Sequence, residues 1–125
     1  MSALAMILTA GMTVGIGPEK GSSEVRDEVI EKIDCFRRES DLKKRRDLAK
    51  QLGPIHDARV TLALMEVVLQ EDAEPGLLVV ASSMLVHHHI PEKDWGAAKY
   101  WTICRLWWEK NEADVRRRAN KLPYQ

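Results

Sequence analysis

Apolar and charged residues alternate with a helical period through most of the chain. Near its start, Val25, Val29, Ile33 and Phe36 recur every three or four residues, and charged side chains fill the positions between them. Because this spacing puts the apolar residues on one side of a helix, the pattern predicts an amphipathic helix over about residues 24–38.

A second helix is predicted between Asp41 and Gly53. Asp41, together with Ser40 before it, offers a side-chain oxygen that can cap the first turn. Gly53 suits a left-handed helix end, and Pro54 after it cannot continue a helix. The helix is therefore expected to stop at this Gly-Pro pair.

The next two predicted helices, Val60–Gln70 and Glu74–His88, are apolar on most sides. Pro75 falls in the first turn of the second of them, where a missing N–H costs little. Residues 77–80 alone could also form a buried strand, but no partner strand is evident elsewhere, so helix is preferred. A helix that is apolar all round is buried on several sides or contributes to an interface.

Two more helices are expected after Pro91, one over Glu92–Lys110 and a last one that begins at Asn111 or Asp114 and ends near Asn120. The predicted fold is therefore all-α, with about six helices in three antiparallel pairs. A length of 125 residues corresponds to one domain.

The N-terminal segment, residues 1–22, differs from the rest. Residues 1–17 carry no charged side chain, and residues 18–23 have the composition of a linker. The apolar run resembles an export signal but lacks its cationic start, and it is short for a membrane-spanning helix. A degraded export signal, an apolar segment packed on the domain and a disordered tail are the three interpretations. The protein is accordingly expected to be cytoplasmic or exported, without integral membrane insertion, and its folded domain to cover residues 23–125.

Residues 41–69, DLKKRRDLAKQLGPIHDARVTLALMEVVL, contain a recognisable repeat unit. It consists of an acidic turn, a helix ending in Leu-Gly, a turn with Asp-x-Arg, and a second apolar helix. This unit resembles a HEAT repeat of the kind found in short bacterial HEAT-like proteins. The matching residues are Asp41, Arg45, Ala49, Leu52, Gly53, Ile55, Asp57, Arg59, Leu62, Leu64, Met65 and Leu69.

The resemblance implies a right-handed superhelix of stacked helix pairs, in which Gly53 permits the tight turn, Asp57 accepts backbone N–H groups and Arg59 reaches across the turn. A second unit starts at Glu74 but lacks the turn motif. A third, around residues 112–117, is degenerate. Proteins of this kind act as interaction modules, so the resemblance implies a non-enzymatic role in binding another protein.

A binding groove is predicted on the second helices of the pairs. Its expected floor is uncharged, and basic residues of two clusters, 43–46 and 116–118, are expected to flank it. The predicted groove residues are Arg45, Arg46, Val79, Ser82, Ser83, Arg116 and Arg117. Nucleic-acid binding through the same basic residues is the alternative, although a net charge of zero and the acidic neighbours favour an ordinary solvated face.

Aromatic residues are concentrated between positions 95 and 108, with four tryptophans and one tyrosine. One helical stripe cannot bury all of them, so Tyr100 and Trp107 are predicted to form an exposed patch that could support a homodimer.

No catalytic, cofactor or metal site is predicted. The consecutive histidines at 87–89 cannot all face one point, and no nearby residue completes a metal ligand set. Cys35 and Cys104 lack metal-binding spacing and are expected to be buried thiols, with a disulfide only in an exported protein. No nucleophile motif surrounds any serine or cysteine, so the chain is not expected to be an enzyme.

Overall fold

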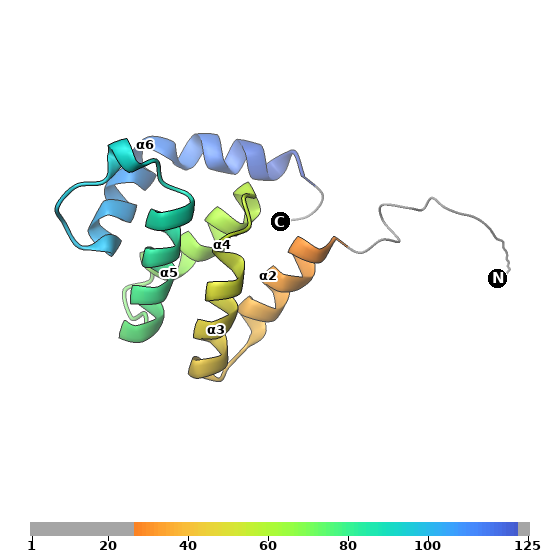
Figure 1. Ribbon diagram of the computed structural model, residues 1–125. Helices are drawn as coiled ribbons and strands as arrows, with labels where there is room; N and C mark the ends of the chain where they lie inside the picture. Colours follow the sequence, from red (N-terminus) through yellow and green to blue (C-terminus); the bar gives the residue numbers. More distant parts are fainter. Residues whose placement is uncertain (1–26, 123–125) are drawn as a thin grey trace, which may run out of the picture. The chain divides into compact units, whose positions relative to one another are not determined.

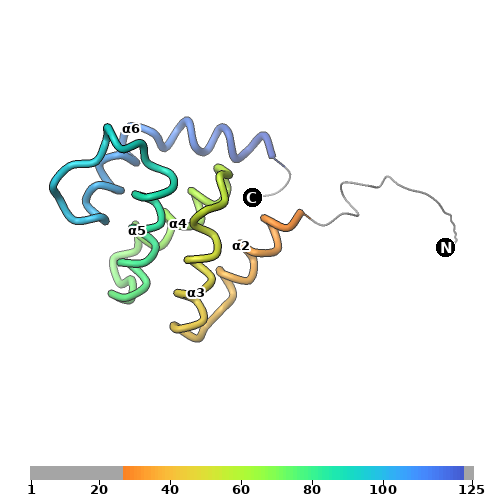
Figure 2. Tube along the Cα trace, in the orientation of Figure 1, coloured from red at the N-terminus to blue at the C-terminus, as the bar shows by residue number. Residues whose placement is uncertain are grey.

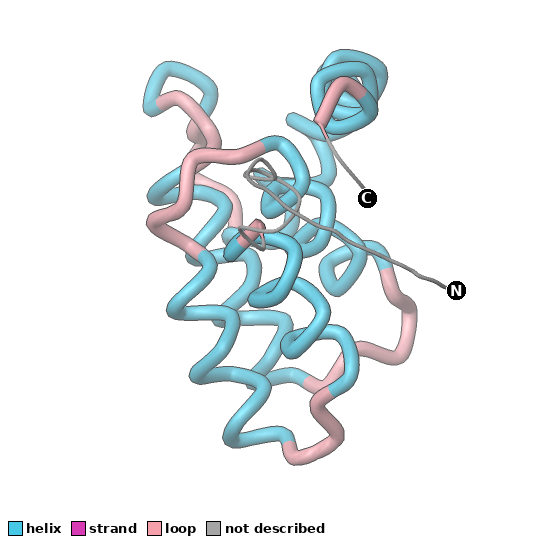
Figure 3. Tube along the Cα trace, turned by 90° about the vertical axis from the view of Figure 1, so that its right-hand side faces the viewer, coloured by secondary structure: helices cyan, strands magenta, loops and turns pink. Residues whose placement is uncertain are grey.

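The computed structural model describes residues 27–122, and over that range it contains helices and loops but no strand (Figure 3). Its helices are α2 (Glu28–Arg38), α3 (Leu42–Leu52), α4 (Ala58–Leu69), α5 (Pro75–His88), the short 3₁₀-helix η2 (Glu92–Asp94) and α6 (Tyr100–Asn120). The all-α prediction is confirmed for this part of the chain. The N-terminal segment 1–22 and its boundary with the domain lie outside the described residues, and those predictions remain untested.

The chain divides into two compact units, residues 1–31 and 32–125, and the second unit holds α3, α4, α5 and α6. Within it, α4 packs against both α5 and α6, α3 packs against α5, and α5 packs against α6. In Figures 1 and 2, α3 and α5 run side by side, and the C-terminal half of α6 crosses the top of the view. Helix α5 therefore contacts three neighbours and lies at the centre of this arrangement.

Helix α3 begins as its sequence predicts. The Asp41 side chain accepts a hydrogen bond from the backbone N–H of Lys44 at 2.9 Å, which satisfies one of the unpaired amides of the first turn. Replacing Asp41 with Ala is expected to lower the free energy of unfolding by about 1 kcal/mol. Chemical denaturation of Asp47→Ala, which removes the same charge from the same helix without removing a cap, provides the control. Equal losses in the two variants would contradict this role of Asp41.

The predicted left-handed conformation at Gly53 is wrong. Its φ of −46° and ψ of −53° are right-handed, which any residue can adopt. The glycine is needed for a different reason, because a Cβ atom at this position would lie 2.4 Å from the sulfur and 3.1 Å from the Cβ of Met84. Gly53 thus allows the end of α3 to approach α5 closely.

Helix α4 is the core helix of the unit, with ten of its twelve residues buried. It starts two residues earlier than expected because Asp57 caps it, accepting the N–H of Arg59 at 2.8 Å. The Arg59 side chain is only 5% exposed and folds back onto Asp57, with Nη2 2.8 Å from Oδ2. The acceptor role predicted for Asp57 is confirmed, and Arg59 forms an ion pair with the same residue.

Helices α3 and α5 run parallel. A Cβ atom on Gly76, near the start of α5, would lie 3.1 Å from Nη1 of Arg46, and one on Gly53, at the end of α3, would touch Met84 farther along α5. Both helices therefore point the same way, and α4, which connects them, returns the chain to the start of α5. Glu74 caps α5 by accepting the N–H groups of residues 76 and 77 at 3.0 and 2.8 Å.

The two helices expected after Pro91 are instead the single helix α6, and Trp95 lies in the loop before it. Asn111 and Asp114, which were predicted to start a new helix, instead make contacts within α6. The Asn111 side chain donates to the carbonyl of Trp107 at 2.8 Å, and Asp114 pairs with Arg117 and Arg118 one turn later. With no Gly or Pro between them, the two predicted segments merge. The described residues therefore form five α-helices, so the predicted division into three helix pairs is not reproduced.

Candidate protein-binding surface

Helix α5 presents an uncharged face to solvent. None of its fourteen residues is Asp, Glu, Lys or Arg. Its outward positions are Gly76, Val79, Val80, Ser83 and His87, which lie on one side of the helix and are exposed or half-buried. Val79, near the middle, is 45% exposed. These five residues are called the α5 strip below.

Aromatic side chains close one end of the α5 strip. His87 packs edge-on against Tyr100 and Trp95, with ring centroids 5.3 and 5.5 Å apart, and its Nε2 atom lies 3.2 Å from the Tyr100 hydroxyl. Tyr100 remains 38% exposed, as predicted for a surface aromatic. The Trp95 indole N–H donates to the carbonyl of Ile90 at 3.0 Å, which fixes the loop beneath this cluster.

Helix α3 runs alongside the α5 strip, and its Arg46 borders the strip at Gly76. Arg46 lies beside Gly76 and pairs with Glu74 at 3.1 Å. The pKa of Glu74 is lowered, first by the backbone N–H groups of its helix cap and then by Arg46. Lys43 and Lys50 are three residues before and four residues after Arg46, and thus on the same side of α3. Lys43, Arg46 and Lys50 are called the α3 edge below.

The predicted groove residues of α5 divide between surface and core. Val79 and Ser83 belong to the α5 strip and are exposed and half-buried, respectively. Ser82 does not, since it is fully buried and its hydroxyl donates to the carbonyl of Leu78 at 2.7 Å. Helix α5 is apolar on nearly every side, so its residue pattern does not indicate which serine faces outward.

The predicted arginines are engaged within the protein. Arg45 donates from Nε to the carbonyl of Phe36 at 3.1 Å, with its guanidinium 4.9 Å from the centre of that ring. Arg116 pairs with Glu112 at 2.8 Å, and Arg117 pairs with Asp114.

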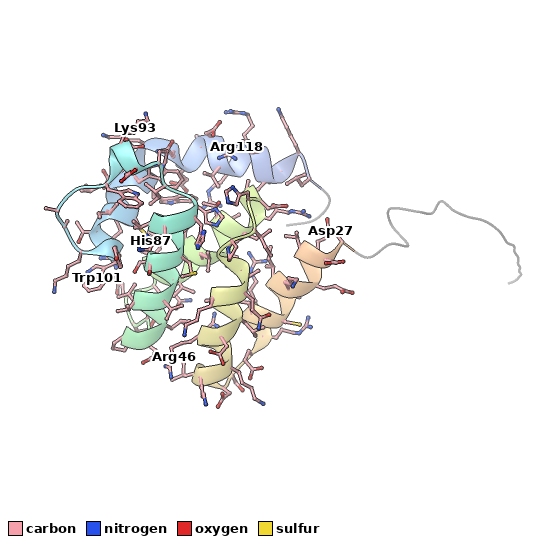
Figure 4. The ribbon with its side chains drawn as sticks, viewed as in Figure 1. Asp27, Arg46, His87, Lys93, Trp101 and Arg118 are labelled. Carbon is pink, nitrogen blue, oxygen red and sulfur yellow. The ribbon has the colours of Figure 1, made fainter. Side chains whose placement is uncertain are left out.

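The two basic clusters are also far apart. Figure 4 shows Arg46 at the lower edge of the view and Arg118, from the second cluster, at the upper edge. Of the predicted arginines, only Arg46 borders the α5 strip through a contact that the structure shows.

The expectation that Trp107 is exposed is wrong. It is 9% exposed, with its ring 6.5 Å from that of Trp108 in the buried side of α6. Of the predicted aromatic patch, Tyr100 alone is at the surface.

The two cysteines differ in exposure. Cys35 is exposed, contrary to expectation, while Cys104 is buried. Both are free thiols, and burial raises the pKa of Cys104 to about 12.

A cleft of about 190 Å³ lies where α4 begins and α5 ends. It is lined by His56, Asp57, Ala58, Thr61, His88, His89, Trp107 and Arg118. Both ring nitrogens of His89 are used structurally, with Nε2 2.9 Å from the carbonyl of Gly53 and Nδ1 2.8 Å from the Thr61 hydroxyl. Burial is the main reason why the pKa of His89 falls to about 4. His89 thus joins α3, α4 and α5 as a neutral side chain.

Groups of side chains suited to a metal ion are not found in residues 27–122, and no helix in that range is long and apolar enough to cross a membrane. Comparisons with protein-family models, curated proteins and solved structures found no significant match. The function must therefore be argued from the geometry of the surface itself.

Sequence reasoning missed Gly76, Val80, His87 and Lys50 as members of this surface, whereas Lys43 belongs to the basic cluster 43–46 that was expected to flank it. A usable signal existed for the first three. Residues 75–88 lack any charged side chain, and these positions share helical spacing with Val79. Lys50 could be assigned only after the parallel packing of α3 and α5 brought Arg46, on the same side of α3, beside Gly76.

Proposed function

We propose that this protein is a non-enzymatic, HEAT-like interaction module that binds another protein through the α5 strip. The observation that carries the proposal is the uncharged solvent-facing side of α5, with Val79 45% exposed near its middle. Surface helices normally carry charged residues on their open side, so an uncharged open side favours a role in contact. The flanking aromatic residue Tyr100 is of a type enriched at the centres of interfaces.

The HEAT-like part of the proposal is supported by the arrangement of α3, α4 and α5. Helix α3 ends in a tight turn at Gly53, and the apolar helix α4 then returns the chain to the start of α5. Helix α5 runs parallel to α3. In stacked helical repeats, equivalent helices of successive units pack in this parallel manner. We assign α3 and α4 to one unit and α5 with α6 to the next.

Val79→Glu is expected to weaken partner binding about tenfold or more, because it places a charge where an apolar contact forms. Leu106→Glu is the matched control. Leu106 is 56% exposed, and its position on α6 faces away from the buried side of that helix. Affinity capture from native lysate with quantitative mass spectrometry would compare the two variants with the wild-type chain.

The proposal predicts that some of the proteins captured by the wild-type chain are no longer captured by Val79→Glu but are still captured by Leu106→Glu. If both variants retain the same proteins, or both lose them equally, the α5 strip is not the contact surface. Circular dichroism of each variant would establish that the helices are intact before binding is compared.

A further inference from the structure

We infer that the partner segment that binds the α5 strip is an acidic amphipathic α-helix. The inference rests on the proposed function and adds the chemistry of the partner. Two neighbouring features carry it: the uncharged α5 strip, and the basic α3 edge of Lys43, Arg46 and Lys50 alongside it. An apolar stripe bordered by carboxylates would complement both features at once.

The dimensions of the α5 strip suit a helix. From Gly76 to His87 it extends about 16 Å, or three helical turns. Its small residues, Gly76 and Ser83, lie one turn before and one turn after the Val side chains at 79 and 80, which are its only bulky apolar groups. A partner helix can therefore lay its apolar residues along this path, in the way that amphipathic helices occupy apolar grooves.

The charge of α3 selects an acidic partner. The helix carries five Lys and Arg residues and a single acidic residue, Asp47. Glu74 already neutralises part of the charge of Arg46. Among the carboxylates of the described residues, none lies within salt-bridge distance of Lys43, Lys44 or Lys50. These lysines leave a local positive charge beside an uncharged surface, although the whole chain has no net charge.

The same features argue against nucleic acid as the ligand. Arginine is the residue best suited to grip phosphates, yet Arg45, Arg116 and Arg117 already contact groups within the protein, and only Arg46 borders the α5 strip. A phosphate backbone would also leave the apolar Val79 without a matching contact. Since a helix can satisfy both the lysines and the apolar strip, a protein partner is favoured.

The test uses four designed helical peptides of about 18 residues, titrated into the full-length, ¹⁵N-labelled chain. Three share one leucine stripe and differ only in its flanking residues, which are Glu, Gln or Lys; the fourth keeps the Glu flanks and has Ser in place of Leu. The Glu-flanked peptide is expected to shift the backbone amides of Val79, Val80 and Ser83. Its affinity should exceed that of the Lys-flanked peptide about tenfold. Each exposed charge pair between a Glu of the peptide and the α3 edge adds little binding free energy, but several such pairs add up.

The double variant Lys43→Glu/Lys50→Glu should reverse this preference, and added salt should reduce it. Equal affinity for the Glu-, Gln- and Lys-flanked peptides would overturn the acidic partner while leaving the α5 strip as the binding surface. If no leucine peptide shifts the α5 amides, the proposed function fails as well. If short double-stranded DNA binds with a steep salt dependence, and Val79→Glu leaves its affinity unchanged, the ligand is a nucleic acid and not a protein.

Discussion

Gly53→Val is expected to lower the free energy of unfolding by roughly 2–3 kcal/mol, the upper part of the range for overpacking a well-packed contact. The reason is the close approach of α3 and α5. Even a Cβ atom at this position would lie 3.1 Å from the Cβ of Met84, so a valine forces the two helices apart or Met84 out of its place. Urea denaturation of the wild-type and variant chains measures the loss.

Gly96→Val is the matched control, because a Cβ atom at Gly96 meets nothing closer than 4.0 Å. A second control is Met84→Ala in the Gly53→Val background, which removes the side chain that a valine displaces. The double variant is expected to be more stable than the sum of the two single losses indicates. Purely additive losses, or an equal loss at Gly96, would show that the Met84 contact is not the reason for a glycine at position 53.

Three of the helix starts carry a sequence signal because they depend on neighbouring residues. Asp41, Asp57 and Glu74 each cap the helix that follows them with hydrogen bonds to amides two or three residues away. Such contacts are encoded locally and leave a visible sequence signal. The acidic residue at 114 carried the same signal, but its carboxylate is used by arginines one turn later, and the helix continues through it.

The candidate surface was less predictable because its parts come from different helices. Val79 and Ser83 were identified, while the adjacent Ser82 was placed at the surface in error. A helix with apolar residues on nearly every side does not reveal which side is open until its neighbours are known. The α3 edge depends on the packing of Arg46 beside Gly76, thirty residues later in the chain, and no local pattern records that contact.

Acidification is expected to destabilise the protein through His89. Its folded-state pKa is about 4, below the ordinary value of 6.5, so the unfolded chain takes up a proton at this position more readily than the folded chain. The contribution of neutral His89 is complete above about pH 6.5 and is lost as the pH falls to about 4. Allowing for partial exposure, the loss amounts to roughly 2 kcal/mol.

Burial is the main reason why the pKa of His89 is lowered, and the hydrogen-bond geometry shows which proton the neutral ring carries. The carbonyl of Gly53 can only accept, so Nε2 carries the proton and Nδ1 accepts from the Thr61 hydroxyl. A second proton on Nδ1 would turn the Thr61 hydroxyl away from the ring and toward the carbonyl of Asp57, 3.4 Å away. The neighbouring histidines His56 and His88 oppose the added charge, and Asp57 only partly offsets them.

His89→Gln is the decisive variant, because a glutamine amide can still donate to the Gly53 carbonyl but does not titrate. Free energies of unfolding measured by urea denaturation between pH 7 and 4 should fall less for this variant than for the wild-type chain, by roughly 2 kcal/mol over the interval. His87→Gln, at the exposed aromatic end of the α5 strip, should keep the wild-type dependence. If His89→Gln instead follows the wild-type curve, acid sensitivity originates elsewhere, and His89 does not link α3, α4 and α5 as a neutral group.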